Sequence, residues 1–264
     1  KVVLEVQEKI KMKPIGQHIE KFKDKLLSLR NKFLFFVLKR KYGNDTSTIL
    51  YGHFLDYEDN FTSMSQKEFY DKYKSSPDWG VYHPNDLQQW YDPAGITHDS
   101  EGVKFHITKN TKVVTSYVVD GSTKPQENLI PVTIPYGVGL CVSKKAFKYG
   151  VFEWCIKLPK GAALWPAVWL SCRDSWPPEI DVIEAYSDEK GNYGQELQSN
   201  IHFGSNGDNH TQTGPIEHGY LIDKDEYFIM HLHWEKDFIK IYYNGFLVRK
   251  ITNKKNLEWF KDVY

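Results

Sequence analysis

Apolar residues follow a helical spacing near the start of this chain. Between residues 15 and 41 they recur every three or four positions, which places them along one side of a helix. The residues of this seam are Ile19, Phe22, Leu26, Leu29, Phe33 and Phe36. Pro14 stands before the pattern and Gly43 after it, as helix start and stop signals do. We therefore expect an amphipathic helix over residues 15–41.

After Leu50 the helical spacing mostly ends, and short strand-like stretches replace it. Gly, Pro, Asn and Asp interrupt them, and examples are residues 102–107, 112–119, 139–142 and 152–158. A short helix is expected over residues 65–74. The dipeptide Asn244-Gly245, between two apolar runs, is a strong signal for a two-residue hairpin. Many short strands of this kind favour an all-β fold, a sandwich of antiparallel sheets.

Three carboxylates fall within six positions of one strand-like segment. Glu179 and Asp181 share a face, because side chains alternate sides along a strand. Glu184 lies at an odd offset from both and would point to the opposite face. A β-bulge near Ile183 would turn it back, since a bulge adds one residue to one strand. We expect this bulge, and we expect the strand to begin at Glu179 because Pro178 cannot donate to a ladder.

A row of acids is costly to bury without partners, so it indicates a wet site rather than a packed core. Two carboxylates that face one reacting bond are the groups that most glycoside hydrolases use. The alternative is a strand whose acids face open solvent and perform no chemistry. The residues around the acids favour the first interpretation.

Several sequence blocks surround the acids in a fixed order. They are Tyr149-Gly-Val-Phe-Glu153, Lys157-Leu-Pro-Lys-Gly161, Trp165-Pro-Ala-Val-Trp-Leu170 and Glu179-Ile-Asp-Val-Ile-Glu184. Here the chain resembles glycoside hydrolase family 16, over roughly residues 51–252. The resemblance implies a jelly-roll β-sandwich with a concave substrate cleft. The bulged E-x-D-x-x-E spacing resembles the group that includes laminarinases, agarases and carrageenases.

The resemblance also assigns roles to the acids. It implies that Glu179 is the nucleophile and that Glu184 is the general acid and then the general base, with Asp181 between them. Three like charges cannot all ionise cheaply in one row, so at least one proton should be retained. We expect Glu184 to be protonated and Glu179 ionised, with Asp181 hydrogen-bonded to the nucleophile.

Further residues are candidates for substrate contact. They are Trp165, Trp169, Trp176, Asn200, His202 and Arg173. The resemblance makes Trp165 and Trp176 platforms for sugar rings, and a core position is the alternative for each. Trp169 shares the strand parity of Trp165. Asn200 and His202 share one face of a neighbouring strand, whereas Arg173 lies in the loop before the acids, where an ordinary surface arginine is the alternative.

The net charge of zero hides an asymmetry between two parts of the chain. Residues 1–42 contain 12 Lys and Arg against 4 Asp and Glu, which leaves 22 against 30 in the remainder. We expect a basic helical arm over residues 1–43 and a β-sandwich domain over 44–264. The arm could pack on the domain or on a partner chain, lie on an anionic surface, or be a linker from a larger protein. No companion motif supports nucleic-acid binding.

The sequence predicts no cofactor and no metal. It contains no glycine loop for nucleotides, no HExxH and no GxSxG. His231 and His233 share a strand face, but no third ligand follows at a diagnostic spacing.

The predicted function is that of an endo-acting, retaining glycoside hydrolase that cleaves a polysaccharide, either a β-1,3-glucan or a β-galactan. The alternative is a non-catalytic carbohydrate-binding or surface-attachment β-sandwich protein. A polysaccharide substrate favours an extracellular or surface-associated location, although no signal peptide is visible. Residues 254–264 do not supply the strands with which the family normally ends. Either the chain is shortened or the N-terminal arm substitutes for these strands, and in both cases a sheet edge or part of the cleft could be exposed.

Overall fold

The computed structural model describes residues 52–83, 86–116, 130–191, 193, 197–204, 211–212, 216–217 and 226–261. The helix expected over residues 15–41 lies outside them, as does the expected domain boundary between residues 43 and 44. Both stay predictions. The described residues divide into two compact units, of which the first comprises those within 52–53 and 149–261 and the second comprises those within 54–148.

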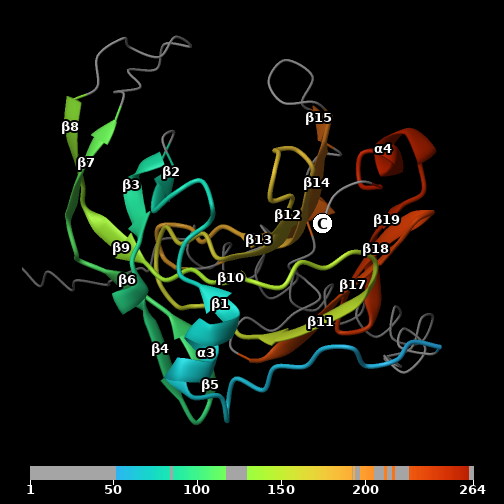
Figure 1. Cartoon of the computed structure of the whole chain (residues 1–264), viewed down its shortest axis with the longest axis horizontal. Coiled ribbons are helices and arrows are strands. Elements are labelled where there is room, and N and C mark those ends of the chain that lie inside the picture. The colour runs from blue at the N-terminus through green and yellow to red at the C-terminus, as the bar shows by residue number, and fades with distance from the viewer. Residues whose placement is uncertain are drawn as a thin grey trace, which may run out of the picture. The chain divides into compact units, whose positions relative to one another are not determined.

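The first unit contains a sheet that we call the acid-bearing sheet, because its strand β13 carries Glu179, Asp181 and Glu184. Its strand order is β12-β13-β14-β15, and β16 also pairs with β14 (Figure 1). The strands are β12 (Ala167–Ser171), β13 (Glu179–Ala185), β14 (Leu197–Phe203), β15 (Thr211–Gln212) and β16 (Ile216–Glu217). All of these pairings are antiparallel.

The second sheet of this unit is the histidine-bearing sheet, named for His231 and His233 of strand β17. Its order is β11-β17-β18-β19, again antiparallel throughout (Figure 1). The strands are β11 (Gly150–Ile156), β17 (Phe228–Glu235), β18 (Phe238–Tyr243) and β19 (Phe246–Ile251). A short helix, α4 (Lys254–Glu258), follows β19, so no strand follows the hairpin among the described residues.

The two sheets bury their apolar faces in one shared core. The contributing side chains include Ile180, Val182, Ile183 and Ala185 of β13 and Phe228, Met230, Leu232 and Trp234 of β17. Fully burying a side chain of this size contributes about 1.5–3 kcal/mol relative to exposure. The alternation of buried and polar positions along both strands therefore fixes which face of each sheet points away from the core.

The second unit is built from short elements. They are α3 (Gln66–Lys72), β1 (Tyr73–Lys74), β2 (Tyr82–His83), β3 (Asp86–Tyr91), η1 (Pro93–Gly95), β4 (Ile96–Asp99), β5 (Gly102–Phe105), β6 (Ile107–Thr108), β7 (Lys112–Ser116), β8 (Ile130–Ile134), β9 (Tyr136–Val138) and β10 (Val142–Ser143). They form one four-stranded sheet, β2-β3-β9-β6, and three two-stranded sheets, among the residues that the structure describes.

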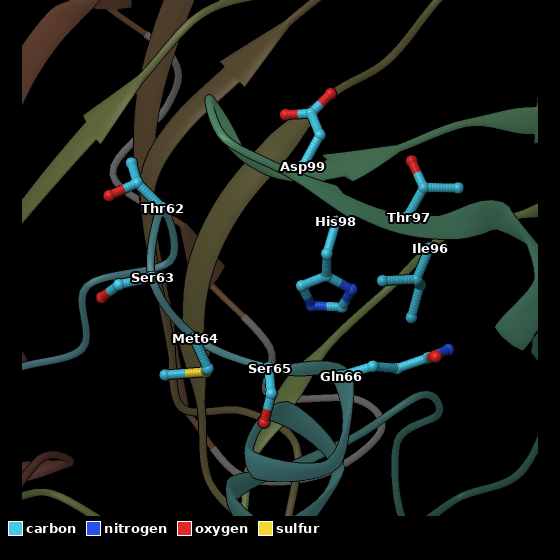
Figure 2. Close-up of a pocket in the computed structure, with 9 residues that line it drawn as sticks. All are labelled: Thr62, Ser63, Met64, Ser65, Gln66, Ile96, Thr97, His98 and Asp99. Atoms are coloured by element: carbon cyan, nitrogen blue, oxygen red, sulfur yellow. The ribbon is translucent and has the colours of Figure 1, made fainter.

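A pocket of about 550 Å³ lies in the second unit, between residues 62–66 and 96–99. Figure 2 shows the His98 ring between these two segments. Nε2 of His98 is buried there without a hydrogen-bond partner within the described part of the chain. None of the predicted site residues lines this pocket, so it is separate from the candidate active site.

The predicted all-β sandwich is confirmed, and so are two local predictions. Helix α3 covers Gln66–Lys72 of the predicted 65–74, whereas Tyr73 and Lys74 form strand β1. The helix begins after Ser65, whose side chain accepts a hydrogen bond from the Glu68 amide. Asn244 and Gly245 form the turn between β18 and β19, with φ angles of 48° and 81°. Positive φ at both turn positions is what a two-residue hairpin of this type requires.

Other strand predictions were partly wrong in their bounds. The stretch 139–142 is a strand only at its end, because the backbone of Gly139 packs closely against Gly95 and its amide donates to the His106 carbonyl. The stretch 102–107 is interrupted at His106, whose amide donates to the Gly95 carbonyl. The stretch 152–158 begins and ends two residues earlier than predicted, as β11. Part of 112–119 lies outside the described residues.

No helix in the described part of the chain is both long enough and apolar enough to cross a bilayer.

Candidate active site

The expected β-bulge is present in the middle of β13. Asp181 pairs with Asn200 and Glu184 pairs with Gln198, so two residues of β13 lie opposite the single residue Ser199 of β14. The register with β12 shifts at the same place. The extra residue reverses the alternation, and Glu179, Asp181 and Glu184 therefore share the face that points away from the core. The strand begins at Glu179, as predicted.

Buried polar groups from the opposite sheet hold the backbone around the bulge. The Tyr243 hydroxyl donates to the Val182 carbonyl at 2.7 Å. On the partner strand, Arg249 Nε donates to Ser199 Oγ at 2.9 Å, and Arg249 Nη2 donates to the Ser199 carbonyl. Tyr243 and Arg249 are almost completely buried. A bulge leaves ladder groups unpaired, and these contacts satisfy groups at that position that would otherwise be buried at a cost.

His202 lies beside the first two acids. Its Nε2 is 3.0 Å from Asp181 Oδ2 and 3.9 Å from Glu179 Oε1. Asn200 Nδ2 is 3.2 Å from the same ring nitrogen and also donates to Gln212 Oε1 at 2.7 Å. His202 pairs with Glu179 across the strands, and Asn200 pairs with Asp181. The predicted shared face of Asn200 and His202 is therefore the face that carries the acids.

Aromatic donors contact the two outer glutamates. Trp176 Nε1 donates to Glu179 Oε2 at 3.2 Å. Trp165 Nε1 donates to Glu184 Oε1 at 3.2 Å, and the Tyr186 hydroxyl donates to the same oxygen at 3.0 Å. At least one hydrogen-bond donor thus holds each outer glutamate in place. These donors contact only one of the two carboxylate oxygens of each glutamate.

Both tryptophans retain large exposed areas. Trp165 is 57% exposed and Trp176 is 42% exposed, so each indole ring keeps part of its surface open to solvent. The Trp165 ring lies 5.0 Å from the Tyr186 ring, and the Trp176 ring lies 5.8 Å from the His202 ring. Exposed aromatic faces with a polar edge anchored to a carboxylate are suited to stacking against sugar rings.

The remaining two candidates lie in different settings. Trp169 pairs directly with Asp181 across β12 and β13, which places it on the acid face. Arg173 lies exposed in the loop between β12 and β13. The structure therefore brings Trp169 beside the acids, whereas Arg173 remains at the surface of the loop.

Crowding and burial disfavour the ionised form of the outer glutamates. Burial, and then repulsion by Asp181, raise the pKa of Glu179 to about 8. The same two causes raise the pKa of Glu184. Burial opposes the charged form of His202, but the contact with Asp181 outweighs burial and raises the pKa of this histidine. The row thus keeps at least one proton at neutral pH, as expected.

The sequence prediction placed the retained proton on Glu184 and left Glu179 ionised, whereas the pKa of about 8 favours a proton on Glu179 at neutral pH as well. The raised pKa of Glu184 agrees with the predicted proton on that residue. The raised pKa of Glu179 does not agree with the predicted ionised state of this residue at neutral pH.

Several residues of the site were not predicted. Tyr186 follows Glu184 by two positions, so strand parity was a signal that could have indicated it. Gln212, Tyr243 and Arg249 come from other strands, and no local pattern points to them. Glu179, Asp181 and His202 also place potential metal-ligand atoms within 4.8 Å of one another, so this part of the row could hold a cation.

The family model for glycosyl hydrolases family 16 matches residues 90–262, more than half of the chain. The chain belongs to this family. Glucan endo-1,3-beta-glucosidase A1 of Niallia circulans is 27% identical over 228 residues, which cover 83% of this chain and 32% of that protein. Glucan endo-1,3-beta-glucosidase of Cryptopygus antarcticus is 28% identical over 190 residues, which cover 69% of this chain and 63% of that protein.

Solved structures show the same jelly-roll fold. A family 16 endo-glucanase from Bacteroides ovatus has a TM-score of 0.53 at 21% identity, over 78% of this chain and 82% of that one. The laminarinase catalytic domain from Thermotoga maritima has a TM-score of 0.52 at 17% identity, over 75% and 77% of the two chains. The family 16 chain described here spans less than two thirds of both glucosidases named above.

Proposed function

We propose that this chain is an endo-acting, retaining glycoside hydrolase whose substrate is a β-1,3-glucan. The observation that carries the proposal is the bulge that places Glu179, Asp181 and Glu184 on one face of β13. Family membership and two relatives named as endo-1,3-β-glucosidases support the reaction class and the linkage. A β-galactan is the second substrate class that the sequence pattern favours.

The proposed reaction is a double displacement. The ionised Glu179 attacks the anomeric carbon while the bond to the leaving oxygen breaks, and Glu184 donates its proton to that oxygen. Glu184 then removes a proton from water, which attacks the same carbon and releases Glu179. Asp181 contacts His202 and disfavours the ionised form of Glu179, so it would influence the charge of the nucleophile in both steps.

Substrate contact is proposed for the groups beside the acids. Trp165 and Trp176 would each stack a sugar ring next to the glutamate that its indole N–H contacts. Trp169, Asn200 and His202 line the same face and would bind hydroxyl groups or the ring between them. Arg173, exposed in its loop, would contact only a substrate that extends beyond the acid row.

A panel of polysaccharides with product profiling tests this proposal. Laminarin, mixed-linkage glucan, agar and carrageenan are incubated with the protein and with Glu179→Gln, and products are sized and their anomeric configuration is followed by NMR. We expect oligosaccharides from laminarin with the β configuration retained, and nearly complete loss of activity in Glu179→Gln. Glu101→Gln is the matched control, because Glu101 is an exposed glutamate in the second unit, paired with Lys104. An inverted product, or equal activity in Glu179→Gln, would overturn the mechanism.

A non-catalytic carbohydrate-binding protein is the second candidate. One relative, at 28% identity over 124 residues, is named a beta-1,3-glucan-binding protein from Penaeus monodon. Binding to laminarin without any product release would favour it. A surface-attachment role, with the basic arm of residues 1–43 against a partner chain or an anionic surface, would be favoured if deletion of the arm abolished surface association. An extracellular or surface-associated location is the setting in which any of these roles meets a polysaccharide.

A further inference from the structure

A second cluster of titratable side chains lies in the first unit, on the histidine-bearing sheet. His233 and Glu235 are two residues apart on β17, so both side chains point away from the core. His53, which belongs to the same unit, lies against His233 although it is far away in sequence. Each of the three residues offers one ligand atom, and these atoms all lie within 4.8 Å of one another.

We propose that His53, His233 and Glu235 form a binding site for a divalent transition-metal ion of the zinc type. The sequence prediction of no metal rested on the pair His231 and His233, which has no third ligand at a diagnostic spacing. His231 is not part of the proposed site. His53, which is distant in the sequence, joins His233 and Glu235.

The distances within the cluster suit a small tetrahedral ion. His233 Nε2 and Glu235 Oε1 are 3.2 Å apart. Zinc bonds to nitrogen and oxygen of roughly 2.0–2.2 Å place neighbouring tetrahedral ligands about 3.3–3.5 Å apart. The His53 and His233 rings are nearly perpendicular, with 86° between their planes and 5.0 Å between their centroids. Only small side-chain movements are needed to bring the His53 nitrogen to the same spacing.

The chemistry of the three donors selects the kind of ion. Imidazole suits zinc, copper and nickel, whereas calcium takes six to eight oxygen ligands. Three protein ligands leave a fourth tetrahedral position for water, because His53 is exposed and the cluster is open to solvent. We therefore expect Zn²⁺ to bind and Ca²⁺ not to bind at this cluster.

Side chains around the cluster hold His233 in place, and one of them also places a positive charge near the proposed metal ion. The Phe238 ring packs edge-on against His233 at 4.8 Å. Lys240 pairs with His233 across β17 and β18, and its Nζ lies 4.2 Å from the centroid of the Phe238 ring. The Lys240 charge weakens the binding of any cation at the cluster. It follows that removing this charge should strengthen metal binding, whereas removing a ligand should weaken it.

Titration of the metal-free full chain with ZnCl₂, followed by calorimetry, tests the proposal. We expect one ion per chain, with an affinity that falls by about ten- to a hundredfold or more in His53→Ala, His233→Ala and Glu235→Gln. Lys240→Met should bind zinc about two- to fivefold more tightly, as expected for loss of one partly exposed like charge. Co²⁺, whose visible spectrum reports tetrahedral coordination, serves as a second probe.

Control variants separate this site from other histidines. The chain has 10 histidines. His106→Ala removes an exposed histidine of the second unit and should leave zinc affinity unchanged. Melting curves without metal identify any variant that is misfolded, and His53→Ala is the decisive one because His53 is exposed. The proposal would be overturned if the unmodified chain did not bind one zinc ion per chain, or if His53→Ala and Glu235→Gln bound zinc as tightly as the unmodified chain.

Discussion

The two sheets of the first unit carry polar side chains on the faces that point away from their shared core, and these faces differ in charge balance. On the acid-bearing sheet, three carboxyls lie on the same face as a single histidine of the described residues, His202, which contacts Asp181 and lies near Glu179. On the histidine-bearing sheet each histidine has its own glutamate. His231 Nε2 lies 2.7 Å from Glu153, and His233 Nε2 lies 3.2 Å from Glu235.

This difference separates two kinds of polar surface. An excess of acids forces protons to remain on carboxyls, as the raised pKa of Glu179 and of Glu184 shows. Carboxyls that keep protons near neutral pH can act as general acids. Paired histidines and glutamates provide neutral nitrogen and anionic oxygen donors, which favours ligand or metal binding instead. The same alternation of side chains along a strand therefore produces different chemistry when the ratio of charges changes.

Apart from the loss of activity expected in Glu179→Gln, the largest effect is expected from Glu184→Gln. Without a general acid, kcat on laminarin should fall by about 10²–10⁴-fold. An aryl glycoside whose leaving group needs no protonation should lose much less activity in the first step. Measuring both substrates by product release tests the role of Glu184.

The matched control for that variant lies on the other sheet. Glu153→Gln removes a carboxylate that contacts His231 on the face of β11 and β17, and its activity should stay close to that of the unmodified chain. An equal loss of kcat in Glu184→Gln and Glu153→Gln would contradict the functional difference between the two sheets.

A smaller effect is expected from Tyr243→Phe, which removes the donor to the Val182 carbonyl at the bulge. A buried carbonyl without a partner costs about 1–3 kcal/mol in the free energy of unfolding. Displacement of Glu184 should also lower kcat by about ten- to a hundredfold with little change in KM. Thermal melting and steady-state kinetics measure the two effects, and Tyr242→Phe, on the opposite face of β18, is the control. Loss of stability with an unchanged kcat would show that Tyr243 does not position the acid.

The smallest effect concerns the pH dependence of stability. The pKa of Glu179 is raised from 4.5 to about 8 in the folded chain, so the folded state binds the proton more tightly than the unfolded state. The contribution of the protonated Glu179 carboxyl to the stability of the folded chain is therefore complete below about pH 4.5, and it is lost as the pH rises towards 8. Glu179→Gln, which cannot ionise, should be more stable than the unmodified chain by roughly 1–3 kcal/mol at pH 8 to 9. Denaturant melts across this pH range measure the difference. If stability depended on pH in the same way in the unmodified chain and in Glu179→Gln, the raised pKa of Glu179 could not be its cause.

Local residue patterns predicted much of the candidate site. Period-two alternation placed Glu179 and Asp181 together, and the odd offset of Glu184 required a bulge, which the register confirms. The same parity argument placed Asn200 and His202 on one face. Trp169 was predicted less directly, from its parity with Trp165, and it lies opposite Asp181.

Other features could not be predicted because no local pattern encodes them. Gly139 was expected in a strand, but the close approach of Gly95, a distant residue, turned it into a loop. In the sequence, Tyr243 and Arg249 are ordinary hairpin positions. Only the packing of the two sheets brings Tyr243 to Val182 and Arg249 to Ser199.

The sequence by itself determined the fold class and the order of the acids, because strand alternation, turns and the bulge depend on neighbouring residues. It could not determine which distant groups contact those acids, or which distant residue contacts His233 on the histidine-bearing sheet. Tertiary structure decided the buried support from Tyr243 and Arg249, and it decided the approach of His53 to His233. The physical reason is that such contacts depend on how two sheets and a distant segment pack, and burial and proton affinity are set only once that packing exists.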